Sequence, residues 1–198
     1  GANNGISGSN SNFLIKKGIR AILIDPIKNS INSCNNIYKH NKKVKTILSA
    51  CGAEDKQIKI YTSLDGSSDS KASALGHIDK LHYDNKKRDF IVCDQKKIST
   101  IIDHFLQKNF INSDTNFALL SIDTEGYDLE VLKGLGDRKP LIIISEFSKS
   151  LPLLEYEKRK WLIENEYFLI KTTYSNCIFL KNEYSKKFFS NPKNHKII

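Results

Sequence analysis

The sequence has no methionine, no pair of cysteines at C-x-x-C spacing and no long hydrophobic run. A chain without methionine that begins at Gly1 is expected to start downstream of its gene's start, and its first residues lack the basic and apolar regions of a signal peptide. The longest apolar runs fall far short of the roughly 20 residues that cross a bilayer. The cysteines are too widely spaced for a metal site or a disulfide framework. We therefore expect a cytoplasmic protein with reduced thiols, no bound metal and no membrane span.

The length and charge limit the possible classes of protein. The chain has 198 residues, which is the size of one α/β domain, and a net charge of +9. The lysines are scattered along the chain instead of being clustered, which favours a solvated basic surface over a nucleic-acid interface. We expect no nucleic-acid partner, and the sequence leaves the oligomeric state undetermined. Association with an anionic sugar polymer or a membrane surface stays open.

Near-continuous apolar runs alternate with segments of helical periodicity. The runs predict strands at Arg20–Asp25, Val44–Ser49, Phe117–Ile122 and Leu141–Phe147. The periodicity predicts helices at Asn12–Lys17, Ser30–Lys39, Ile98–Lys108, Asp128–Lys133 and Leu153–Asn165. Continuous apolar strands are typical of a parallel sheet that is buried on both faces. The alternation therefore predicts a doubly wound α/β fold, with a mostly parallel sheet and helices on both faces.

The end of the chain departs from this alternation. The segments Tyr167–Thr173 and Cys177–Leu180, joined by a Ser-Asn turn, predict an antiparallel β-hairpin. The polar stretch Ser63–Lys87 is expected to be an extended loop or a small insertion. We expect one domain at residues 1–181, followed by a basic tail at residues 182–198.

A glycine-containing loop opens the chain, about 20 residues before an acidic residue at the end of a predicted strand. The loop comprises Gly1, Ala2, Asn3, Asn4 and Gly5, and the acidic residue is Asp25. Glycines let a backbone turn tightly against a ligand, and such a carboxylate can accept hydrogen bonds from both hydroxyls of an adenosine ribose. A dinucleotide fingerprint would need glycine where Asn3 and Ile6 stand. The pattern therefore favours S-adenosylmethionine, which has no phosphate, over NAD(P).

A second motif places two carboxylates at a strand end. The strand at Phe117–Ile122 is followed by Asp123 and Glu125, and Gly126 permits the turn into the next helix. Because ligands of open α/β sheets bind at the carboxyl ends of the strands, we expect Asp123 and Glu125 to lie beside the glycine loop. Either carboxylate could act as a base, orient a cofactor or orient a metal. Alternatively, Glu125 or Asp128 could cap the following helix.

The order of these motifs resembles the FkbM family of methyltransferases over about residues 1–147. The resemblance rests on the loop G-A-N-N-G, the strand ending Ile24-Asp25-Pro26, and the run I-D-T-E-G-Y-D-L-E-V-L-K-G. It implies a Rossmann-like class I methyltransferase fold, with S-adenosylmethionine as cofactor and a hydroxyl of a sugar, glycan or secondary metabolite as acceptor. Family members usually carry a strand just before the glycine loop. We therefore expect the first, central strand to be missing from this chain.

The resemblance also implies roles for individual residues. Cofactor binding falls to the loop residues 1–5, Asp25, Pro26, Cys51, Gly52 and Asp123; catalysis to Asp123 and Glu125; and acceptor binding to Glu146. The polar stretch adds His77 as a further candidate for acceptor binding. His77 and His82 are alternative bases, since imidazole titrates near neutrality. Two other functions stay open at this point, an NAD(P)-dependent oxidoreductase and a non-catalytic basic module that binds nucleic acid.

Overall fold

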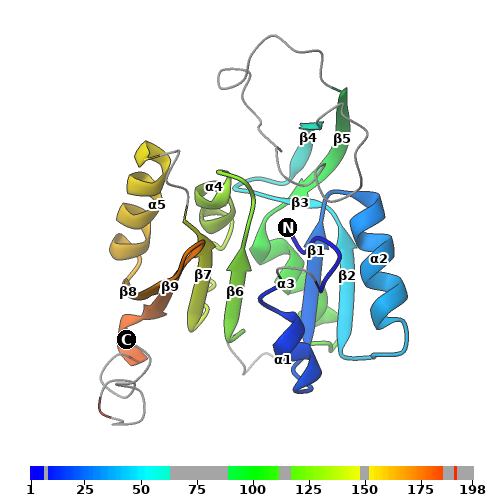
Figure 1. Cartoon of the computed structure of the whole chain (residues 1–198), viewed down its shortest axis with the longest axis horizontal. Helices are drawn as coiled ribbons and strands as arrows, with labels where there is room; N and C mark the ends of the chain where they lie inside the picture. The colour runs from blue at the N-terminus through cyan, green and yellow to red at the C-terminus, as the bar shows by residue number, and fades with distance from the viewer. Residues whose placement is uncertain (7–8, 63–88, 112–116, 148–151, 185–189, 191–198) are drawn as a thin grey trace. The chain divides into compact units, whose positions relative to one another are not determined.

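The structure is a computed structural model that describes residues 1–6, 9–62, 89–111, 117–147, 152–184 and 190 (Figure 1). The chain divides into two compact units, Gly1–Lys97 and Ile98–Ile198. The predicted insertion at residues 63–87 lies outside the described residues, together with His77. Of the predicted tail, the structure describes a short 3-10 helix, η3 (Asn182–Tyr184), and Ser190.

The first unit begins with a parallel β-α-β arrangement. Strand β1 (Ala21–Asp25) pairs with β2 (Val44–Leu48) along its whole length, and helix α2 (Lys28–Tyr38) connects the two strands. Figure 1 shows α2 running alongside this pair. Helix α1 (Asn12–Lys16) supplies Ile15 to a small core that also contains Leu23, Cys34 and Val44. The pairing brings the carboxyl ends of both strands to one edge.

A second sheet in the first unit contains strands that the sequence pattern did not predict. Strand β5 (Asp89–Lys96) lies between β3 (Ala50–Cys51), which runs parallel to it, and β4 (Lys56–Thr62), which runs antiparallel. Strand β4 was missed because its isoleucines alternate with lysines, so that no continuous apolar run marks it. Such alternation is typical of an antiparallel strand with one solvated face.

The second unit contains a mixed sheet in the order β6-β7-β9-β8. Strands β6 (Leu119–Ile122) and β7 (Ile142–Glu146) are parallel, and β9 (Asn176–Lys181) runs antiparallel to both β7 and β8 (Tyr167–Thr172). Helices α3 (Ile98–Gln107), α4 (Asp128–Lys133) and α5 (Pro152–Glu164) complete the unit. Its buried side chains include Ile122, Leu132, Ile143, Leu162 and Phe179.

The observed elements agree with the predicted α/β class but not with one mostly parallel sheet. The described strands form three sheets, and antiparallel pairs are as frequent as parallel ones. Two of the antiparallel pairs involve β9 of the C-terminal hairpin, which the sequence predicted to be antiparallel. The third, between β4 and β5 on either side of the segment predicted to be an insertion, was not predicted. No helix in the described ranges is long and apolar enough to cross a membrane.

Candidate active site

The glycine loop is a tight turn fastened to the end of β1. Asn3 and Gly5 have positive φ angles of 48° and 74°. The Ala2 N–H donates to the Ile24 carbonyl at 2.9 Å, so the loop continues the edge of the strand. A Cβ atom at Gly5 would lie 3.0 Å from the Cys34 sulfur, and the positive φ would strain any L side chain as well. Gly5 therefore has no room for a larger residue.

Asp25 connects this loop to the chain that follows β1. One carboxylate oxygen accepts the Asn3 N–H at 2.9 Å, and the other accepts the Ile27 N–H at 2.9 Å. The side chain is 2% exposed. Each oxygen retains a further acceptor position, because an ionised carboxylate offers about four. The structure thus brings together the loop and Asp25, which the sequence predicted to share one site.

Helix α2 holds the loop from the other side. The Cys34 thiol donates to the Asn3 carbonyl at 3.2 Å, and the Tyr38 hydroxyl donates to the Gly5 carbonyl at 2.8 Å. Burial, and secondarily the Asp25 charge, raise the pKa of Cys34 to about 11, so the thiol keeps the proton that it donates. Neither residue was predicted from the sequence. Their spacing of four residues on one helical face was the only available signal.

Cys51 is the last residue of β3, the short strand that comes after β2, and Gly52 follows it. Burial, with a smaller contribution from the charge of Asp25, raises the pKa of the Cys51 thiol to about 12, which puts the two groups within electrostatic reach. A Cβ atom at Gly52 would lie 2.3 Å from the side-chain amide of Gln95. Gln95 is itself 2% exposed, and its side-chain amide donates to the Glu54 carbonyl at 2.9 Å. Gly52 is therefore required by packing.

The acidic turn of the second unit, Asp123–Gly126, follows β6. Glu125 has a left-handed φ of 52° and Gly126 a φ of 99°, and the turn is closed by a 3.1 Å bond from the Tyr127 N–H to the Thr124 carbonyl. A left-handed conformation is unfavourable for a glutamate by roughly 1–2 kcal/mol. Such strain persists where surrounding contacts fix the backbone, and it clusters at functional sites.

Three carboxylates gather at the ends of the paired strands β6 and β7. Ile122 pairs with Ser145 in the parallel register, so Asp123 and Glu146 each come directly after a paired residue. Partial burial and then the charge of Glu146 raise the pKa of Glu125 to about 7, with Asp123 and Asp128 adding to the effect. Partial burial and then the charge of Asp123 also raise the pKa of Glu146. The structure thus brings Asp123, Glu125 and Glu146 into one electrostatic cluster.

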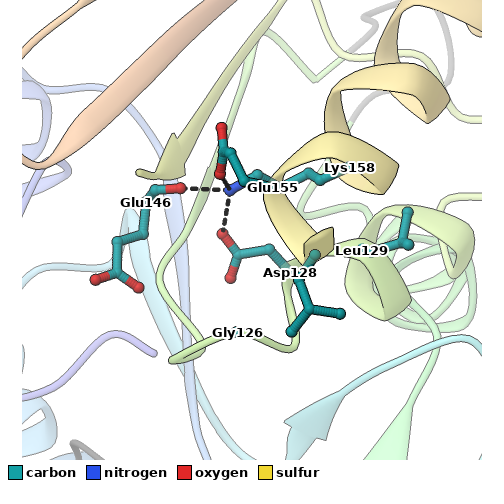
Figure 2. Close-up of a pocket in the computed structure, with 7 residues that line it drawn as sticks. Gly126, Asp128, Leu129, Glu146, Glu155 and Lys158 are labelled. Carbon is teal, nitrogen blue, oxygen red and sulfur yellow. Dashed lines mark hydrogen bonds and ion pairs between the residues drawn. The ribbon is translucent and has the colours of Figure 1, made fainter. Parts of the chain in front are cut away.

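A network of buried polar groups lies behind this cluster (Figure 2). Asp128 is 3% exposed and accepts hydrogen bonds from the Thr124 N–H at 3.1 Å, the Thr124 hydroxyl at 2.5 Å and the Ser145 hydroxyl at 2.7 Å. Lys158 of α5 is 5% exposed and lies 3.6 Å from Asp128 and 2.9 Å from Glu155. Its ammonium group also donates to the Glu146 backbone carbonyl. Ser145 and Lys158 were not predicted from the sequence.

Neither Glu125 nor Asp128 is the N-terminal cap residue of α4, the alternative role considered for them. The residue that precedes α4 is Tyr127, which forms no side-chain cap, and Asp128 turns its carboxylate back onto Thr124. A small pocket borders the network, lined by Gly126, Asp128, Leu129, Glu146, Leu154, Glu155 and Lys158. No group of three or more histidine, cysteine or acidic residues within the described ranges has a geometry that could hold a metal ion.

Comparison with known proteins assigns the family. No curated protein and no solved structure matches the chain. A family model does match it, that of the methyltransferase FkbM domain, over residues 1–167. The match spans both the glycine loop and the acidic turn, and it confirms the resemblance drawn from those two motifs. The chain belongs to the FkbM methyltransferase family.

Proposed function

We propose that the protein is an S-adenosylmethionine-dependent O-methyltransferase that acts on a hydroxyl of a sugar, glycan or secondary metabolite. The observation that carries the proposal is Glu125, a strained and partly buried carboxyl group with a pKa of about 7. Catalytic acids and bases work best when their pKa lies near the working pH. A strained backbone and a shifted pKa in one residue support a catalytic role over a structural one.

The first unit supplies residues that suit the cofactor. The loop Gly1–Gly5 turns tightly, with positive φ angles at Asn3 and Gly5, and Asp25 joins it to the chain after β1 through the Asn3 and Ile27 amides. Because Asp25 is almost fully buried, we assign it first to holding the loop and then to accepting ribose hydroxyls at its remaining positions. Pro26, Cys51 and Gly52 would border the nucleoside.

When bound, S-adenosylmethionine supplies a methyl group already activated by a sulfonium. The chain's own task is to remove the acceptor's proton and to align its oxygen. Glu125 would take the proton of the acceptor hydroxyl, which leaves the acceptor oxygen able to receive the methyl group. The proton would then remain on the Glu125 carboxyl.

The charges around Glu125 indicate which chemical class of acceptor the site suits. Asp123 and Glu146 add negative charge to the cluster, so hydroxyl groups, which donate hydrogen bonds to carboxylates, suit it better than phosphate or carboxylate groups. We therefore propose a neutral polyhydroxyl acceptor, with Glu146 and Asp123 binding hydroxyls next to the one that reacts. His77 remains a predicted acceptor-binding residue, outside the described residues.

The test is transfer of labelled methyl from S-adenosylmethionine to a panel of neutral and anionic sugars. We expect transfer to neutral sugars, and a loss of about 100-fold or more in Glu125→Gln, which keeps the shape of the side chain and removes the base. Glu130→Gln is the matched control, because Glu130 lies on α4 and pairs with Lys133 at the surface. Unchanged turnover in Glu125→Gln would refute the assignment of the base.

A further inference from the structure

We propose that Asp128 and Lys158 are positioning residues, which clamp the acidic turn to the end of β7 and so fix Glu125 relative to Glu146. The inference rests on the proposed function, because it concerns the residues assigned there to proton removal and acceptor binding. Neither residue needs to touch the substrate. The pair is buried and links three segments, namely the turn after β6, the end of β7, and α5.

Asp128 divides its two carboxylate oxygens between the two segments that it joins. Oδ1 accepts both the N–H and the hydroxyl of Thr124, which stands between Asp123 and Glu125. Oδ2 accepts the hydroxyl of Ser145, which directly precedes Glu146. One rigid group thus bonds to the residues adjacent to all three carboxylates of the cluster. The hydrogen bonds that the Asp128 carboxylate accepts are charge-assisted, and such bonds are stronger than those between neutral groups.

Lys158 completes the clamp from α5. Its ammonium group lies between Asp128 and Glu155 and donates to the backbone carbonyl of Glu146 (Figure 2). The contact with Glu155 at 2.9 Å is an ion pair that lacks the alignment of a hydrogen bond, and Asp128 lies farther away, at 3.6 Å. The hydrogen bond of the lysine is therefore the one to the Glu146 carbonyl. Figure 2 shows the Glu146 carboxyl pointing away from Lys158. The lysine therefore holds the backbone and leaves the carboxyl free of this contact.

The buried Asp128–Lys158 pair is better explained by the positioning of Glu125 than by a gain in stability. A buried ion pair is often no more stabilising than apolar residues of similar volume, because both charges lose their hydration. The left-handed backbone of Glu125 also needs contacts that fix it. The two hydrogen bonds from Thr124 to Asp128 fix the residue that immediately precedes Glu125. Without them the turn is expected to relax and Glu125 to become hydrated.

The first experiment compares two buried lysines of the second unit. Lys158→Met keeps the aliphatic stem and removes the charge, and Lys181→Met is the matched control. Lys181 is 7% exposed and pairs with Glu166 at 2.8 Å. We expect Lys158→Met to lower kcat of methyl transfer about 100-fold with little change in KM for S-adenosylmethionine, which is the size of effect that a misplaced catalytic group produces. Lys181→Met should leave kcat unchanged.

The second experiment leaves every charge in place and does not depend on turnover. The pKa of Glu125 is measured by carboxyl ¹³C NMR, with Glu125→Gln identifying the resonance. Thr124→Val removes the hydroxyl that Asp128 accepts, and Thr124→Ser retains it. The charged groups that raise the pKa of Glu125, namely Glu146, Asp123 and Asp128, are the same in both variants. We expect the pKa to fall toward its usual value of 4.5 in Thr124→Val and to stay near 7 in Thr124→Ser.

The outcomes separate the clamp from the proposed function. If Thr124→Val titrates as the wild type does, the clamp is refuted, whether or not methyl transfer is observed. If the pKa falls in Thr124→Val and the wild type transfers no methyl group to any acceptor, the clamp stands and the proposed function fails. Should Lys158→Met not fold, the two Thr124 variants decide the question alone, since they change only a partly buried hydroxyl-bearing side chain.

Discussion

Replacing Glu125 by glutamine should stabilise the protein at alkaline pH and have little effect at acidic pH. The folded protein favours the neutral carboxyl, because burial and the neighbouring carboxylates raise its pKa from 4.5 to about 7. Ionisation of Glu125 therefore does not lower the free energy of unfolding of the wild type below about pH 4.5. It lowers it by an increasing amount between pH 4.5 and 7, and by a constant amount above pH 7. Glutamine resembles the neutral form at every pH.

The size of the effect follows from the shift. One pKa unit corresponds to about 1.4 kcal/mol, so the shift from 4.5 to about 7 sets an upper limit of roughly 3.5 kcal/mol for this carboxyl. Glu125 is only partly buried, and solvent screening reduces the expected gain to about 1–2 kcal/mol. Urea unfolding of the wild type and Glu125→Gln at pH 4 and pH 8 measures this gain. Glu130→Gln, which alters an exposed ion pair, is the control and should show no such gain at pH 8.

The raised pKa is refuted if Glu125→Gln is less stable than the wild type at pH 8, because the charged form would then be the favoured one in the folded state. It is also refuted if the gain is equal at pH 4 and pH 8, since a conformational effect of the substitution would account for that result without any shifted pKa.

Three further predictions concern the packing of Gly52, the hold of α2 on the glycine loop, and the pH dependence of methyl transfer. Gly52→Ala should lower the free energy of unfolding by about 1–3 kcal/mol, because its Cβ would lie 2.3 Å from the Gln95 amide; thermal unfolding measures this loss. Tyr38→Phe removes the bond to the Gly5 carbonyl and should cost about 1 kcal/mol; calorimetry should also show weaker binding of S-adenosylhomocysteine. The kcat/KM of methyl transfer should rise with pH up to about 7 and then level off as Glu125 ionises, and Glu125→Gln should abolish that rise.

Local sequence patterns were sufficient to predict the elements that have a strong apolar signal. The buried runs predicted β1 and β7, and the helical stripe of isoleucines predicted α3, because both patterns are local. The pattern did not reveal β4, where lysines alternate with isoleucines. It also did not predict how the strands would be divided among sheets, since pairing is decided by contacts between distant segments.

In the candidate site, the residues next to strand ends were predictable from the sequence, and those placed by tertiary contacts were not. Asp25 and the glycine loop were found from their order and spacing, and the acidic turn from its position after a strand. Lys158 was missed because a lysine in a helix rich in lysine and glutamate ordinarily faces water. Its burial becomes visible only once Asp128 and the Glu146 carbonyl are placed around it. The left-handed backbone of Glu125 likewise had no sequence signal beyond the neighbouring glycine.

Calorimetric titration of S-adenosylhomocysteine into the full-length protein tests the central claim most directly, with NADH as the competing cofactor class and Asp25→Ala as the variant. We predict micromolar binding of S-adenosylhomocysteine, no binding of NADH, and a large loss of affinity in Asp25→Ala because the Asn3 and Ile27 amides lose their acceptor. Binding of NADH without binding of S-adenosylhomocysteine would contradict the assignment of the cofactor.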